Sequence, residues 1–173
     1  GEELWRETFK VDPGNVALIA TQENGFAIQG RQSPQEGFAF YILDDTGAIL
    51  YETDNGVGTR FTQLTNGDFV FARNITLQNA SSENDADLVY LNAEGETVWQ
   101  REVVGIRAVQ QLADGNLIVS GYDSTNQIKA LSKYDLEGNF IWQKLYPQLE
   151  GRIYQRLMNR LLVNERGEIA FST

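Results

Sequence analysis

Three acidic residues close together in one polar stretch are the first candidates for chemistry in this sequence. Glu83, Asp85 and Asp87 alternate with other residues at the end of segment 74–87, which is long and polar. Carboxylate oxygens are the ligands that a hard cation such as calcium prefers. The same spacing suits a solvated loop, and no glycine stands at the turn position of an EF-hand. The segment is therefore a weak candidate for a calcium site, and we expect no other cofactor.

The absence of cysteine and histidine restricts the chemistry that this chain can perform by itself. It removes thiol nucleophiles, thiolate metal sites and the usual general base near neutral pH. Paired carboxylates, as in glycoside hydrolysis, remain available, but they must face one another, which sequence spacing cannot establish. We therefore predict no catalytic residue and keep a hydrolase as the alternative.

The segment around Arg152, Arg156 and Arg160 is the one locally basic stretch of an acidic chain with a net charge of −10. That net charge disfavours binding to nucleic acid or to anionic lipid. The three arginines are therefore the predicted contact with a partner. Apolar residues recur every four positions between them, which suits a short inserted helix, but residues 158–163 suit a strand equally well.

The elements that must position these residues are indicated by a repeat in which an aromatic residue follows a glycine by four positions. The four aromatic residues are Trp5, Tyr51, Trp99 and Trp142. They are separated by 46, 48 and 43 residues (5 to 51, 51 to 99, 99 to 142). A large ring at a fixed register can be buried against a neighbouring repeat, so we predict that these four residues dock one repeat onto the next.

A second repeat interleaves with the first and predicts the strands. A glycine stands just ahead of an apolar alternation in the pairs Asn24-Gly25, Asn66-Gly67, Asp114-Gly115 and Arg166-Gly167. Asn-Gly and Asp-Gly between alternating apolar residues are strong hairpin signals. Each period of about 45 residues then holds two hairpins, giving four strands that we call A to D, which is typical of propeller blades. The predicted fold class is all-β, with β-propeller blades of four antiparallel strands.

The two repeats divide the chain into one outer strand, three full blades and part of another. The predicted segments are a strand D at 1–10, blades at 11–54, 57–103 and 105–146, and a partial blade at 152–173. About three and a half blades fall below the four to eight that close a ring. Open sheet edges invite pairing with another chain. We therefore expect part of a larger propeller, with missing blades or a second copy completing the ring.

The repeat resembles that of PQQ-like bacterial propellers and of propeller lipoproteins common in Bacteroidota. Segments 91–99 and 134–142 carry the likeness, since each has Asp or Asn, then a turn glycine, then a tryptophan four residues later. PQQ-dependent dehydrogenases need a vicinal cysteine pair, which this chain lacks, and the sialidase Asp-box has a shorter glycine-to-tryptophan gap. The resemblance therefore implies the non-enzymatic end of the family.

Together these features predict a non-catalytic binding or scaffold module. The resemblance implies an exported or cell-surface bacterial protein, or a membrane-associated complex, and an extracytoplasmic location in the periplasm or at the cell surface. A protein partner or a glycan is the expected ligand. No apolar stretch approaches the roughly 18 residues needed to span a bilayer, so we expect no direct membrane insertion.

Overall fold

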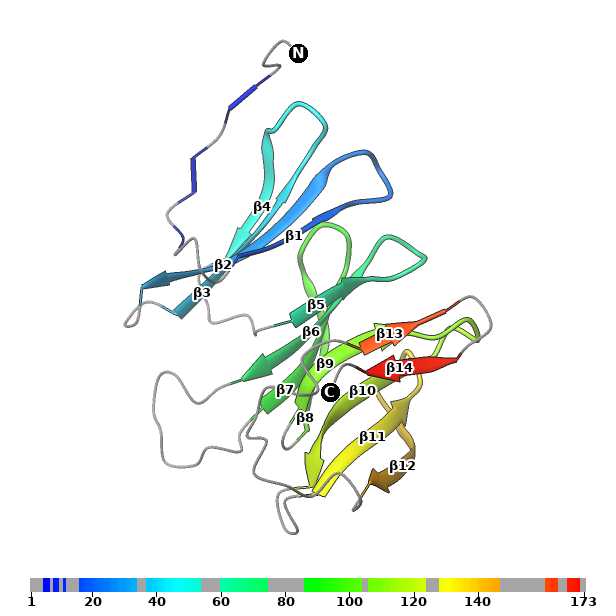
Figure 1. Cartoon of the computed structure of the whole chain (residues 1–173). Coiled ribbons are helices and arrows are strands. Elements are labelled where there is room, and N and C mark those ends of the chain that lie inside the picture. Colours follow the sequence, from blue (N-terminus) through cyan, green and yellow to red (C-terminus); the bar gives the residue numbers. More distant parts are fainter. Residues whose placement is uncertain are drawn as a thin grey trace.

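The structure is a computed structural model of the chain (Figure 1). The described residues are 5–6, 8–9, 11, 16–33, 37–53, 60–74, 86–103, 106–123, 128–146, 161–164 and 168–171. All the elements they form are β-strands, and three four-stranded antiparallel sheets follow one another along the chain. The predicted fold class of all-β, four-stranded propeller blades is confirmed.

The strands of the first two blades follow chain order within their sheets. The first blade consists of β1 (Val16–Ala20), β2 (Phe26–Ser33), β3 (Gly37–Leu43) and β4 (Ile49–Thr53). The second consists of β5 (Arg60–Gln63), β6 (Phe69–Asn74), β7 (Ala86–Leu91) and β8 (Thr97–Glu102). Because every neighbour in each sheet is also the neighbour in sequence, each sheet is a simple meander.

The third blade repeats this order, and a two-stranded sheet follows it. The third blade consists of β9 (Ile106–Gln111), β10 (Leu117–Asp123), β11 (Ile128–Tyr134) and β12 (Phe140–Tyr146). The last sheet pairs β13 (Leu161–Val163) with β14 (Ile169–Phe171). Of the two alternatives for residues 158–163, the described part, 161–163, is a strand, and no helix lies in the described ranges.

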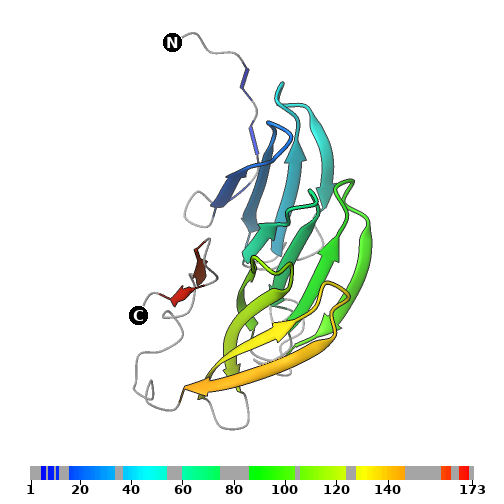
Figure 2. The same cartoon turned by 90° about the vertical axis from the view of Figure 1, so that its right-hand side faces the viewer.

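The outermost strands of successive blades follow one another along the convex side (Figure 2). Strand β9 lies against both β5 and β13. Apolar side chains fill the layers between neighbouring sheets, with Phe40 of the first blade among Phe61, Phe69 and Phe71 of the second. A four-stranded sheet buries both of its faces in this way only when a neighbour covers each one.

The hairpin between the first two strands of each blade uses a three-residue loop that ends in a left-handed residue. Gly67 and Gly115 hold this position in the second and third blades, with φ of 92° and 85°. In the first blade Asn24 holds it, with φ of 61°. The repeat had aligned Gly25 with Gly67 and Gly115, so the left-handed residue of the first blade lies one position earlier than the sequence indicated. Gly25 is required for another reason, because a Cβ there would lie 2.1 Å from the Leu43 carbonyl oxygen.

The segment before β1 covers the outer face of the first blade. None of its described residues lies in a strand, so the predicted strand D at 1–10 is not seen in them. Phe9 and Val11 pack against the cluster that includes Tyr41, and a Cβ on Gly30 would meet Val11 at 2.6 Å. This segment therefore shields apolar residues of β3 in the way that a preceding blade would.

Candidate partner-binding surfaces

The turn glycine of each blade's second hairpin is covered by an aromatic side chain from the preceding blade or, in the first blade, from the segment before β1. The contacts are Trp5 on Gly47, Tyr51 on Gly95 and Trp99 on Gly138. The three glycines have φ between 79° and 87°, and a Cβ on Gly95 would lie 2.2 Å from the Tyr51 ring. A positive φ and this close approach both favour glycine. The repeat of glycine and aromatic in the sequence therefore reflects the same glycine–aromatic contact at three positions.

Each of these glycines is the last residue of a four-residue turn whose first residue is Asp or Asn. The Asp44 carboxylate accepts hydrogen bonds from the backbone N–H groups of Thr46 and Ala48, both at 2.9 Å, and from the Thr46 hydroxyl at 2.7 Å. The hydroxyl and the Ala48 N–H are the main reasons that the pKa of Asp44 lies below its usual value. The turn is therefore held by hydrogen bonds among its own residues, in addition to the contact with the aromatic ring.

The contact around Trp99 shows the most complete set of interactions with a turn. The Trp99 ring lies over Gly138, and its Nε1 donates a 2.8 Å hydrogen bond to the carbonyl oxygen of Leu136. The Arg101 guanidinium lies 5.7 Å from the centre of the Trp99 ring and donates to the carbonyl oxygen of Glu137 at 3.4 Å. One outer strand therefore holds two carbonyl groups and the glycine of the next blade's turn.

The third strand of a blade is also tied to the first hairpin of the same blade. The Tyr90 hydroxyl donates to an Asp68 carboxylate oxygen at 2.5 Å and accepts from Asn66 Nδ2 at 3.0 Å. Burial, followed by the bond to Asp68, raises the pKa of Tyr90. In the third blade Lys133 takes the register of Tyr90 and forms an ion pair of 2.5 Å with Asp114. These side chains serve the architecture of the blades.

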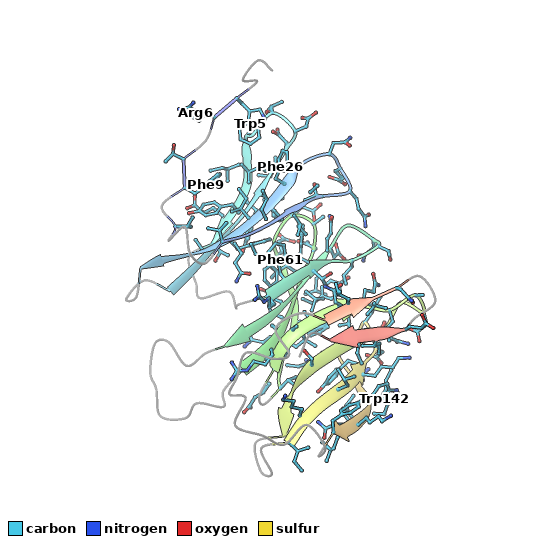
Figure 3. The ribbon with its side chains drawn as sticks, in the orientation of Figure 1. Trp5, Arg6, Phe9, Phe26, Phe61 and Trp142 are labelled. Carbon is cyan, nitrogen blue, oxygen red and sulfur yellow. The ribbon has the colours of Figure 1, made fainter. Side chains whose placement is uncertain are left out.

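Trp142 occupies the docking position of the third blade. It pairs with Lys133 across β11 and β12, as Trp99 pairs with Tyr90 across β7 and β8. Lys144 is on the same face, opposite Leu131, and Leu131 belongs to the cluster that packs against β13 and β14. Trp142 is 38% exposed at the outer edge of this face (Figure 3). No turn glycine that the structure describes lies on its ring.

A row of exposed apolar residues marks the outer strands of all three blades. Each outer strand has a β-bulge just after its turn, and the extra residue is Leu50, Val98 or Ile141. These side chains are 63%, 57% and 46% exposed, respectively. The bulge lets the next residue, the docking aromatic, pair with the third strand, and it turns the extra residue away from the ladder. We call these three residues the bulge row.

The bulge row was missed in the sequence, although a signal for it was present. In the repeat, the residue before each aromatic is a leucine, valine or isoleucine. Simple alternation along a strand would place neighbouring residues on opposite faces, so an apolar residue next to a docking aromatic indicates a bulge or an exposed apolar side chain. Only the register shift between the paired strands distinguishes these outcomes.

The other predicted site residues lie largely outside the described part of the chain. Arg152, Arg156 and Arg160 are outside it, as are Glu83 and Asp85. Asp87 lies in β7, where its backbone pairs with Arg73 and Glu102. Within the described ranges, no group of three His, Cys, Asp or Glu side chains could hold a metal ion. The same ranges contain no helix long and apolar enough to cross a membrane.

Comparison with known proteins identifies the architecture and no closer relationship. No protein-family model matches the chain, and no curated protein matches it. Among solved structures, a crystal structure of a eukaryotic initiation factor matches with a TM-score of 0.54 at 10% sequence identity. The match covers 70% of this chain and 30% of that one. At this level of identity the likeness shows a shared fold alone.

Proposed function

We propose that this chain is a non-catalytic β-propeller scaffold that binds a protein partner along its outer rim. The bulge row carries the proposal, because three consecutive blades present an aliphatic side chain to solvent at the same position. Single exposed apolar residues are ordinary on a protein surface. Recurrence at one register on the outer strands, which follow one another in space, favours a partner that contacts several blades at once (Figure 2).

The chemistry of the row favours a protein partner over a glycan. Leu50, Val98 and Ile141 offer aliphatic groups and no hydrogen-bond donors or acceptors at their tips. The outer strands β4, β8 and β12 are each paired on one side alone among the described strands, so backbone groups lie beside these side chains. An extended or β-structured protein segment can use both, with backbone hydrogen bonds for affinity and side-chain contacts for specificity.

The cellular setting belongs to the same proposal. The glycine-to-aromatic repeat resembles PQQ-like and lipoprotein-type bacterial propellers, and on this resemblance we assign the chain to an exported or cell-surface protein or a membrane-associated complex. Arg152, Arg156 and Arg160 stay a predicted basic contact with the partner, and a calcium site at Glu83, Asp85 and Asp87 stays a weaker prediction.

The test selects peptides that bind the protein and then measures their binding after the three bulge-row side chains are replaced. A phage-displayed peptide library is panned on the protein, and the selected peptides are measured by biolayer interferometry against the protein and its L50S/V98S/I141S variant. We expect the variant to remain folded and to lose at least about tenfold in affinity, since each buried aliphatic side chain contributes about 1.5–3 kcal/mol. The matched control is E52S/E102S, which changes exposed polar positions of the same outer strands.

Two outcomes would contradict the proposal. The first is selection of peptides whose affinity for L50S/V98S/I141S equals their affinity for the unaltered protein, since the partner surface would then lie elsewhere. The second is turnover of a panel of aryl glycosides and esters by the purified protein, lost when a pair of carboxylates is replaced by amides. That result would favour the hydrolase alternative.

A further inference from the structure

The face of the third blade that carries Trp142 has the groups that hold a turn in the neighbouring interfaces. Twice in this chain an outer-strand aromatic, Tyr51 or Trp99, lies on the glycine of the next blade's second hairpin, and Trp5 of the segment before β1 makes the same contact with Gly47. Trp142 has the same register in β12 as Trp99 in β8. The contact partner of Trp142 is therefore expected to be the turn of a β-hairpin that carries glycine at a positive φ.

The details of the Trp99 contact indicate what Trp142 and its neighbour would bind. In β8, Trp99 Nε1 and Arg101 donate to the carbonyl oxygens of the two residues that precede Gly138. In β12 the corresponding residues are Trp142 and Lys144, two positions apart on one face. An indole N–H and an ammonium group can donate to the same two carbonyl groups of a turn, so the donor set for a hairpin turn is present on β12.

Beside this face, one edge of β14 has no partner among the described strands. In the full blades the second strand pairs with the third: β2 with β3, β6 with β7, and β10 with β11. In the described part of the chain, β14 pairs with β13 alone. The β13–β14 pair already covers the inner part of the third blade, where Val163 and Ile169 pack against Ile118 and Leu131. A hairpin that pairs with β14 would cover the remaining outer part, where Trp142 lies.

The charge of this surface favours an acidic turn. Lys133 and Lys144 both lie on the face of Trp142. In the preceding interface Arg101 lies beside the acidic turn 135–138, and its charge is one of the causes that hold the pKa of Asp135 below its usual value, after the hydrogen bonds from Asn139. Lys133 of β11 is already paired with Asp114, so a turn of the form Asp/Asn-x-Glu-Gly, as at 92–95 and 135–138, matches Lys144 of β12.

A second folded copy of the chain has no free turn of this kind to offer in its described part. The glycines at positions 47, 95 and 138 are each covered by an aromatic ring of the same chain. The occupant must then be a hairpin whose turn is uncovered.

We infer that Trp142, Lys144 and the edge of β14 that no described strand pairs with form a receptor for an acidic β-hairpin with an Asp/Asn-x-Glu-Gly turn. Its first strand pairs with β14, and its turn glycine lies on the Trp142 ring. This surface is distinct from the bulge row, and its occupant completes the sheet that β13 and β14 begin.

The probe is a backbone-cyclised peptide of residues 86–103, which contains the turn Asn92 to Gly95. Cyclisation limits the ordering cost that makes an isolated hairpin a weak ligand. Fluorescence anisotropy of the labelled peptide is followed as the unlabelled 173-residue protein is added. We expect saturable binding that falls about tenfold or more with W142A, since an aromatic anchor carries a large share of such a contact. W142F should fall between the two, because it keeps a ring and loses the N–H donor.

The controls separate this contact from general effects on the protein. Leu145 is 39% exposed on the same strand and has the opposite side-chain direction, so L145A should change the affinity less than about twofold if only the Trp142 face is used. K144E should weaken binding of the acidic peptide, and added salt should weaken binding to the unaltered protein. The G95A peptide should bind more weakly, because its Cβ would meet the Trp142 ring.

Three results would overturn the inference. They are equal binding of the peptide to W142A and to the unaltered protein, equal binding of the G95A peptide, and no binding to a protein that circular dichroism shows to be folded. Sedimentation of the protein without peptide provides a further test. Self-association that W142A abolishes would assign this face to a second copy. The two proposals are tested separately: W142A should lose the cyclised peptide and keep the peptides selected on the bulge row, whereas L50S/V98S/I141S should lose the selected peptides and keep the cyclised peptide.

Discussion

At the scale of single residues, the turn glycines are where backbone and packing requirements coincide. Gly95 has a φ of 87°, and its missing Cβ leaves the space that the Tyr51 ring occupies. Gly67 has a φ of 92°, and a Cβ there would meet nothing within 4 Å. The two positions therefore separate the cost of a strained backbone from the cost of losing a docking contact.

We expect G95A to destabilise the protein clearly more than G67A. G67A should lower the free energy of unfolding by about 1–2 kcal/mol, the cost of a left-handed backbone for a residue with a Cβ. G95A adds the displacement of Tyr51 from the interface between the first two blades, and displaced packing costs about a further 1–3 kcal/mol. Urea denaturation followed by circular dichroism measures both variants. Equal losses would mean that the ring moves aside without cost.

At the scale of the strand and hairpin, a glutamine joins neighbouring blades at the inner turns. Gln63 accepts a 3.0 Å hydrogen bond from the Gln22 backbone N–H and donates to the carbonyl of its own turn glycine, Gly67, at 3.0 Å. Gln111 repeats the arrangement one blade later, accepting from the Thr65 N–H at 2.8 Å and donating to Gly115 at 3.1 Å. Each glutamine side chain therefore connects two inner hairpins.

Replacing either glutamine by alanine should affect one interface and leave the other intact. Q111A removes the acceptor of the Thr65 N–H, and Q63A removes the acceptor of the Gln22 N–H. Each loss should cost about 0.5–1.5 kcal/mol, the usual net contribution of such a hydrogen bond. Amide hydrogen exchange by NMR should show faster exchange at Thr65 in Q111A alone and at Gln22 in Q63A alone. Faster exchange of both amides in both variants would show that the hydrogen bonds of Gln63 and Gln111 are coupled.

At the scale of the whole molecule, each blade depends on its neighbour for a core. Phe40 is buried and makes edge contacts with three phenylalanines of the second blade, with ring centres 4.6–5.6 Å apart. A separate cluster joins the second and third blades through residues that include Leu88 and Leu117. The stack is therefore held by layers between sheets, each with its own set of side chains.

We expect F40A to loosen the first interface before the second. The substitution should cost about 3–5 kcal/mol, as for other buried phenylalanines replaced by alanine. Because repeat proteins unfold through their nearest-neighbour contacts, hydrogen exchange should accelerate most in β1 to β4 and least in β10 and β11. Uniform acceleration over all three blades would instead indicate one cooperative unit.

Much of the fold could be predicted because the determinants of each hairpin lie close together in the sequence. The spacing of glycine and aromatic gave the blade period, since one contact needs the same residues in the same order each time. The position of the left-handed residue, at Asn24 and not at Gly25, was not predictable, because either residue suits a turn. Only the approach of the Leu43 carbonyl to Gly25 decides between them. The candidate acidic and basic segments could be named from composition, but their surroundings depend on residues distant in sequence.

The four repeated aromatic residues show most clearly what the sequence determined and what the tertiary structure decided. The sequence by itself determined an all-β chain of four-stranded blades, because alternation and turn chemistry are local properties. The tertiary structure decided which turn each ring covers: Trp5, Tyr51 and Trp99 each lie on a glycine about 40 residues further along the chain. It also decided that Leu50, Val98 and Ile141 face outward, because a bulge is a relation between two paired strands. Contacts of this range depend on how sheets stack, and no spacing within one hairpin specifies that.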